Sequence, residues 1–158
     1  MAQRLLPVAN NHPVKMAIVV SRFNHNVTGG LHSEAMEYFE QHKSKEDICD
    51  TFWVPCAVEI PIITQLLARK STYSVIVCLG AVIRGETDHY DYVCQQVSNG
   101  TQRVSLDFNI PVIFGIVTTD TLEQALTRAS GDPQNHKNRG KEAMEAALEM
   151  ARLYRHLR

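Results

Sequence analysis

The densest group of side chains able to do chemistry lies in residues 80–92. Gly85, Glu86 and Thr87 stand just before an expected helix start, where free backbone amides and the helix dipole attract a phosphate. Histidine titrates near neutral pH, so His89 at that helix start is placed to move a proton beside a bound anion. The stretch is neither a Walker loop nor a GxGxxG fingerprint. On these residues alone, a structural role for His89 is the commoner case and a catalytic role is the alternative.

Other side chains of interest follow separate apolar runs. Phe23 and Asn24 follow the first run, where an aromatic ring more often covers the core than binds a ligand. Glu59 follows the second run at a helix start, where its carboxylate either caps backbone amides or accepts hydrogen bonds from a polyol. Arg128 lies beyond the fourth run, and its guanidinium can bind a phosphate through two parallel hydrogen bonds.

These side chains must be positioned by an alternation of strands and helices. Apolar runs of strand length occupy residues 14–20, 50–54, 73–79 and 111–117. Helical periodicity predicts helices over residues 28–42, 60–69, 90–108, 121–129 and 139–154, with a polar loop at 130–138 before the last one. The unbroken β-branched run in the third strand indicates burial on both faces, as in a parallel sheet.

Strand–helix alternation is typical of right-handed βαβ crossovers. We therefore predict an α/β fold, a three-layer α/β/α sandwich around a mainly parallel four-stranded sheet. It forms a single domain over residues 14–158, after an N-terminal extension of residues 1–13. Ligands of such sheets bind outside the carboxyl ends of the strands. The groups described above should meet at that edge, in a pocket suited to a phosphorylated, hydroxylated small molecule.

The composition restricts the partners. Of 158 residues, 44% are apolar, and 16 basic against 17 acidic residues give a net charge of −1. This balance gives no reason to expect nucleic acid as a partner. The four cysteines lack metal-ligand spacing, no apolar run reaches membrane-spanning length, and the N-terminus is too short and polar for a signal peptide. We expect a cytoplasmic protein that binds no metal and does not associate with a membrane.

Residues 80–94, GAVIRGETDHYDYVC, closely resemble the central motif of the lumazine synthase family. Four further blocks resemble the family in the same order: VSRFN at 20–24, VPCAVEIP at 54–61, PVIFGIVTTDT at 111–121, and the closing GKEA and EMA segments between 140 and 151. The similarity covers most of the chain from about Val14 onward. It implies the flavodoxin-like form of the α/β/α sandwich.

The resemblance also implies a reaction. The family condenses 5-amino-6-(D-ribitylamino)uracil with 3,4-dihydroxy-2-butanone 4-phosphate to 6,7-dimethyl-8-ribityllumazine, the penultimate step of riboflavin biosynthesis. The substrate's own amine attacks the ketone, so no enzyme lysine and no cofactor is required. One alternative is a non-catalytic flavin or lumazine carrier on the same scaffold. His89 and Arg128 argue against it, because a carrier needs neither a proton shuttle nor a phosphate clamp. A flavodoxin-like binding module would need a phosphate loop after the first strand, and residues 21–25 do not form one.

By the resemblance, one set of residues binds the pyrimidine and its ribityl chain. Phe23 would stack on the ring with Asn24 beside it, and Glu59 would accept bonds from ribityl hydroxyls. The backbone groups of two short segments complete the contacts: Ala57 and Val58 toward the ribityl chain, and Ala81, Val82 and Ile83 toward the heterocycle. Phe114 would close the ring pocket from a neighbouring subunit, because the family builds its sites between subunits of a homo-oligomer.

A second set would serve the phosphorylated ketone. Glu86 and Thr87 would contact its phosphate, Arg128 would neutralise that phosphate, and His89 would move protons. The sequence departs from the usual family pattern at Cys56, where glycine is common, so the turn before Ala57 could differ.

The loop between Arg128 and Gly140 is the second departure, since it is longer than in many members and includes Asp132-Pro133. The family's late lysine therefore lacks a secure counterpart, with Lys137 and Arg139 as candidates. In the family, five subunits form a ring, and some members pack such rings into an icosahedral shell. Extra residues in this loop tend to obstruct the contacts between these rings of subunits. We expect a pentamer, or at most paired pentamers, in preference to a sixty-subunit shell.

Overall fold

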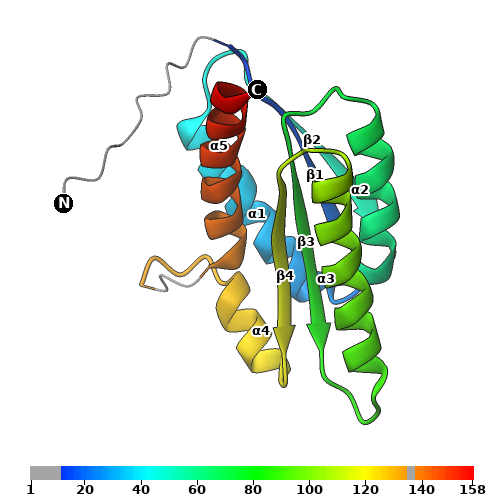
Figure 1. Cartoon of the computed structure of the whole chain (residues 1–158). Helices are drawn as coiled ribbons and strands as arrows, with labels where there is room; N and C mark the ends of the chain where they lie inside the picture. The colour runs from blue at the N-terminus through cyan, green and yellow to red at the C-terminus, as the bar shows by residue number, and fades with distance from the viewer. Residues whose placement is uncertain (1–11, 135–137) are drawn as a thin grey trace, which may run out of the picture.

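Four parallel strands form one sheet in the computed structural model, which describes residues 12–134 and 138–158. The strands are β1 (Lys15–Ser21), β2 (Ile48–Val54), β3 (Val75–Ile83) and β4 (Val112–Thr119). Their order across the sheet is β2-β1-β3-β4, and every neighbouring pair is parallel. The arrowheads of β3 and β4 in Figure 1 accordingly end at the same edge. The predicted four-stranded sheet is confirmed, and it is wholly parallel.

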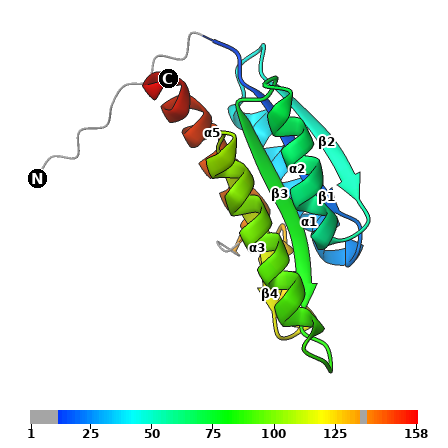
Figure 2. The same ribbon diagram turned by 45° about the vertical axis from the view of Figure 1, so that its right-hand side comes forward.

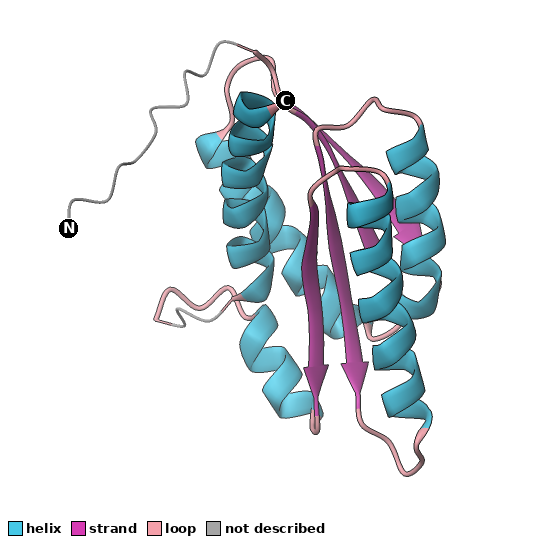
Figure 3. Cartoon of the chain, viewed as in Figure 1, coloured by secondary structure: helices cyan, strands magenta, loops and turns pink. Residues whose placement is uncertain are grey.

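Helices cover both faces of this sheet and make three layers (Figures 1 and 2). On one face lie α1 (His25–His42), α4 (Leu122–Ala129) and α5 (Arg139–Leu157). The other face carries α2 (Ile60–Arg69), preceded by a 3₁₀ turn at Ala57–Glu59, and α3 (His89–Asp107). Figure 3 shows the same alternation of helix and strand along the chain. The α/β/α sandwich is confirmed. No helix of the described residues is long and apolar enough to cross a membrane.

The core consists of two apolar clusters, one on each face of the sheet. Side chains of a strand point alternately to its two faces. In β1, Met16, Ile18 and Val20 therefore pack toward α1 and α5, while Ala17 and Val19 pack toward α2 and α3. All but the last residue of β3 is buried. The prediction that this strand is covered on both faces is confirmed.

Several predicted element boundaries were wrong by two or more residues, and two of these differences have a clear cause in local turns and strand pairing. The third strand, expected to end at Leu79, continues to Ile83, since Gly80 to Ile83 pair with β4. Gly80 is a site of close approach inside the strand, where an added Cβ would lie 3.1 Å from both Ser21 Oγ and Ile116 Cδ1. The first helix starts three residues before the predicted residue 28, because Asn24 adopts a left-handed conformation (φ 60°) and turns the chain at once into α1.

The division into an extension (1–13) and a domain (14–158) stays a prediction, and residues 1–11 lie outside the described part of the chain. At the start of β1 the chain is fastened by the buried carboxylate of Asp47. Its Oδ1 accepts a hydrogen bond from Val14 N at 2.7 Å, and its Oδ2 accepts one from Ser44 N at 2.7 Å. These bonds join β1 to the loop between α1 and β2.

Asp47→Ala is expected to lower the free energy of unfolding by about 1–3 kcal/mol, because it leaves two amide donors without their acceptor. Chemical denaturation followed by circular dichroism measures the change. The control is Asp107→Ala, which removes an exposed partner of Arg103 and should change stability by less than about 0.5 kcal/mol. Equal losses in the two variants would contradict a special role for Asp47.

Candidate active site

A pocket of about 170 Å³ lies at the carboxyl ends of β1 and β3, beside the start of α3. Its walls come from four separate segments of the chain: Phe23, Asn24, Cys56, Ala81, Val82, Ile83, Gly85, Thr87, His89, Tyr90 and Val93. Parallel sheets of this type place their ligands at this edge. The structure thus brings together half of the residues predicted for substrate binding, along with His89.

Phe23 and Asn24 form one wall of this pocket through the turn that follows β1. The Phe23 side chain is 64% exposed, so it does not cover the core. Of the two alternatives for this ring, the core lid does not fit this exposure. Asn24 Nδ2 donates a hydrogen bond to Ala81 O at 3.1 Å and ties the turn to β3. The ring of Phe23 is therefore an exposed part of the pocket wall.

Glu59 lies just outside the pocket and acts as a cap. Its Oε2 accepts a hydrogen bond from Cys56 N at 2.8 Å, which closes the 3₁₀ turn before α2. Ala57 is buried and Val58 half-buried in the same turn, so neither lines the pocket directly. Cys56 has extended backbone angles (φ −138°, ψ 171°) that any residue can adopt. The turn therefore does not require glycine at this position, and the Cys56 side chain becomes part of the pocket wall.

The start of α3 forms the opposite wall. His89 is the first residue of the helix, and its backbone N–H donates to Thr87 Oγ1 at 3.4 Å. Both residues line the pocket, whereas the exposed Glu86 does not. The positive end of a helix dipole therefore lies beside the pocket, where it favours an anion. Next to His89, the Tyr90 ring also lines the pocket, and its burial raises the pKa of its hydroxyl.

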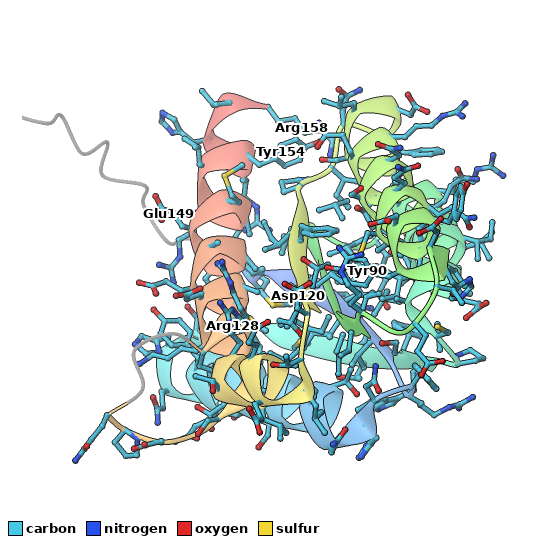
Figure 4. All side chains as sticks on the ribbon, turned by 90° about the horizontal axis from the view of Figure 1, so that it is seen from below. Tyr90, Asp120, Arg128, Glu149, Tyr154 and Arg158 are labelled. Carbon is cyan, nitrogen blue, oxygen red and sulfur yellow. The ribbon has the colours of Figure 1, made fainter. Side chains whose placement is uncertain are left out.

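Phe114 and Arg128 lie away from this pocket. Phe114 is on β4 at the edge of the sheet, with 47% of its surface exposed. Arg128 is near the end of α4, and its Nη1 donates to Gln124 O at 3.0 Å. Seen from the strand-end side in Figure 4, Arg128 and Tyr90 lie on opposite sides of Asp120. One chain therefore does not place these two predicted residues in its own pocket.

Sequence reasoning missed three residues of the pocket wall as site residues: Cys56, Tyr90 and Val93. The helical spacing of Val93 from His89 and Tyr90 was a usable signal, since residues three and four apart share a helix face. A larger cavity of about 440 Å³ lies at the other end of the sheet, between the α2–β3 and α3–β4 loops and the end of α5. It contains none of the predicted site residues.

A parallel α/β/α sandwich with an aromatic ring, strand backbone groups and a helix start around one strand-end pocket is typical of proteins that bind a small molecule at this edge. The chain belongs to the 6,7-dimethyl-8-ribityllumazine synthase family, whose model matches residues 13–155. It is also similar to a protein of Coxiella burnetii (strain Dugway 5J108-111) named 6,7-dimethyl-8-ribityllumazine synthase. The two are 48% identical over 143 residues, which is 90% of this chain and 93% of the relative.

Proposed function

We propose that the strand-end pocket is where this chain carries out its family's reaction. That reaction condenses 5-amino-6-(D-ribitylamino)uracil with 3,4-dihydroxy-2-butanone 4-phosphate to 6,7-dimethyl-8-ribityllumazine, and membership of the family assigns it to this enzyme of riboflavin biosynthesis. One observation carries the location of the site. Phe23 is distant in sequence from the end of β3, Thr87 and His89, yet all of them line a single cavity.

The geometry suits two substrates held side by side. The exposed ring of Phe23 can stack on the pyrimidine, whose edge then meets backbone groups at the end of β3. Glu59 uses Oε2 for its cap and keeps Oε1 for a ribityl hydroxyl. The phosphate of the ketone would lie against Thr87 and the start of α3, where the helix dipole stabilises negative charge.

The chemistry follows from this placement. The pyrimidine amine attacks the ketone carbonyl and gives an imine with loss of water. Removal of a proton from the neighbouring carbon then expels phosphate and leaves an enol, which tautomerises to a ketone. The ribitylamino nitrogen closes the ring on this ketone, and loss of a second water gives the product. His89 is placed to take and return protons, while the helix-start amides and Arg128 stabilise the leaving anion. Because the nucleophile belongs to the substrate, holding both partners together supplies much of the acceleration.

Incubation of the purified protein with both substrates tests this function directly, by the fluorescence of the lumazine product. We expect product to form in step with the release of inorganic phosphate. A non-catalytic carrier would bind the lumazine and release no phosphate, which would overturn the proposal. That the enzyme works in the cytoplasm stays a prediction.

We further propose that the complete site needs a neighbouring subunit. Phe114 and Arg128 lie outside the pocket of their own chain, as expected if they reach the next subunit's pocket. On α4, the helix that carries Arg128, the apolar side chains of Leu122 (43%) and Leu126 (39%) are exposed as well. A ring of subunits would cover such surfaces.

The expected assembly is a pentamer or paired pentamers, because Asp132-Pro133 adds bulk and a fixed backbone angle to the loop before α5. Lys137 in that loop lies outside the described residues, whereas Arg139 begins α5 and pairs with Glu142 at 3.0 Å. Size exclusion with light scattering measures the mass of the assembly. A megadalton particle would contradict the loop argument, and an active monomer would contradict the shared site.

A further inference from the structure

Arg84 joins three parts of the strand-end edge. It is the first residue after β3, and its backbone N–H donates to Thr119 O on β4 at 2.9 Å. Its side-chain Nε donates to Asp120 Oδ1 at 2.9 Å, and Nη1 lies 3.6 Å from Asp91 Oδ1. The guanidinium carbon is 4.2 Å from the centre of the Tyr90 ring. One side chain thus contacts the β4–α4 turn and the first turn of α3 together.

These contacts enclose the segment that the proposed function assigns to the phosphate. Residues 85–88 leave Arg84 and end at His89, so both ends of the loop are fixed close to the guanidinium. Tyr90, on which the guanidinium stacks, also lines the pocket. We propose that Arg84 is a positioning residue that holds this loop and the Tyr90 ring in the geometry that binds the phosphorylated substrate. The inference rests on the proposed location of the active site.

The positive charge of Arg84 also favours phosphate binding, because it offsets two nearby carboxylates. Asp91 and Asp120 place two carboxylates at the edge where the substrate's phosphate would arrive. Arg84 contacts both carboxylates, and the hydrogen bond to Asp120 is the main cause that raises the pKa of its guanidinium. At moderate salt, charges closer than the screening length of about 8–10 Å still act on each other. The two carboxylates would therefore repel a phosphate bound beside them. Without Arg84, both carboxylates would disfavour an anion.

The contact with Asp120 also reaches the helix that carries Arg128. The backbone N–H of Asp120 donates to Gln124 Oε1 at 2.9 Å, within the capping box of α4. Arg128 Nη1 in turn donates to the backbone oxygen of Gln124. A chain of hydrogen bonds therefore joins Arg84 to the other predicted phosphate ligand, and loss of Arg84 would loosen both groups.

Arg84→Met tests the inference by keeping most of the side-chain volume while removing the charge and the donors. We expect the KM for the butanone phosphate and the Kd for inorganic phosphate to rise about tenfold, in line with the effect of small displacements of binding groups. The KM for the pyrimidine should change by less than about twofold, since the pyrimidine binds at the Phe23 side. Arg84→Lys should recover only part of the loss, because lysine lacks the planar fork and stacks less well.

The matched control is Arg103→Met, which breaks a similar exposed ion pair with Asp107 at the far end of α3. It should leave both constants unchanged.

Combining Arg84→Met with Asp120→Asn separates positioning from general stability. The double variant should bind inorganic phosphate more tightly than Arg84→Met alone, because it removes a carboxylate left without its partner. A purely structural role predicts a further loss.

Thr87→Val, measured in parallel, distinguishes this inference from the proposed site. If Thr87→Val weakens phosphate binding and folded Arg84→Met does not, Arg84 has no positioning role although the site stands. If neither variant weakens phosphate binding, the proposed location of the phosphate is itself wrong. Should Arg84→Met fail to fold, Arg84→Lys and Asp120→Asn decide the matter, because an unchanged phosphate Kd in both would overturn the inference.

Discussion

His89→Ala is expected to lower the turnover rate by about ten- to a thousandfold, the range of a general acid–base contribution. His89 is the first residue of α3, lines the pocket and lies beside the proposed phosphate position. Activity should not vanish, because the attacking amine is part of the substrate and the enzyme still holds both partners. The fold should survive, since the hydrogen bond to Thr87 comes from the backbone N–H of residue 89 and not from its ring.

Product formation at saturating concentrations of both substrates measures this loss, with thermal melting as the check on folding. His156→Ala serves as the control, because this exposed histidine lies in the last turn of α5, at the opposite end of the chain's sheet. It should turn over at the wild-type rate. Wild-type turnover in His89→Ala itself would remove the imidazole from the mechanism and leave binding as the role of the α3 start.

The fold could be predicted because its signals are local. The run Val75–Leu79 has the β-branched composition of a strand covered on both faces, and the structure buries all of it. Gly80 shows the limit of this reasoning. In the sequence it looks like the end of a strand, whereas in the structure it accommodates Ser21 and Ile116 from neighbouring strands. Such close approach depends on strands that are distant in sequence, so local composition does not reveal it.

The site was only partly predictable from residue types, and for a similar reason. The exposure of Phe23 follows from the left-handed turn at Asn24, which a strand-and-helix pattern does not contain. For Glu59, capping and polyol binding were both open, and the structure shows the cap through its bond to Cys56. The positions of Phe114 and Arg128 outside the pocket depend on strand order, which puts β4 at an edge. Residue spacing alone does not fix that order.

Arg128→Ala is expected to raise the Kd for inorganic phosphate about ten- to a hundredfold, since a hydrogen bond to a charged group contributes about 1.5–3 kcal/mol. The KM for the butanone phosphate should rise with it, and pyrimidine binding should stay near wild type. The helix should persist, because α4 retains its capping box of Thr121 and Gln124. Isothermal titration with phosphate gives the measurement. Unchanged affinity would place the anion elsewhere, and Arg139→Ala would then be the next variant.

Arg128→Ala also makes the shared site testable, in combination with His89→Ala. In a ring, a subunit that lacks Arg128 still offers its own pocket with His89, and a subunit that lacks His89 still offers Arg128 to its neighbour. Where a subunit that retains His89 has a neighbour that supplies Arg128 to its pocket, that pocket is intact. Random co-assembly should therefore restore about a quarter of the sites, given the repeating contact of a closed ring. Activity of co-expressed variants well above the mean of the two separate proteins would support the exchange. If His89 and Arg128 act on the same substrate from within one chain, co-assembly creates no intact site and the activity stays at that mean.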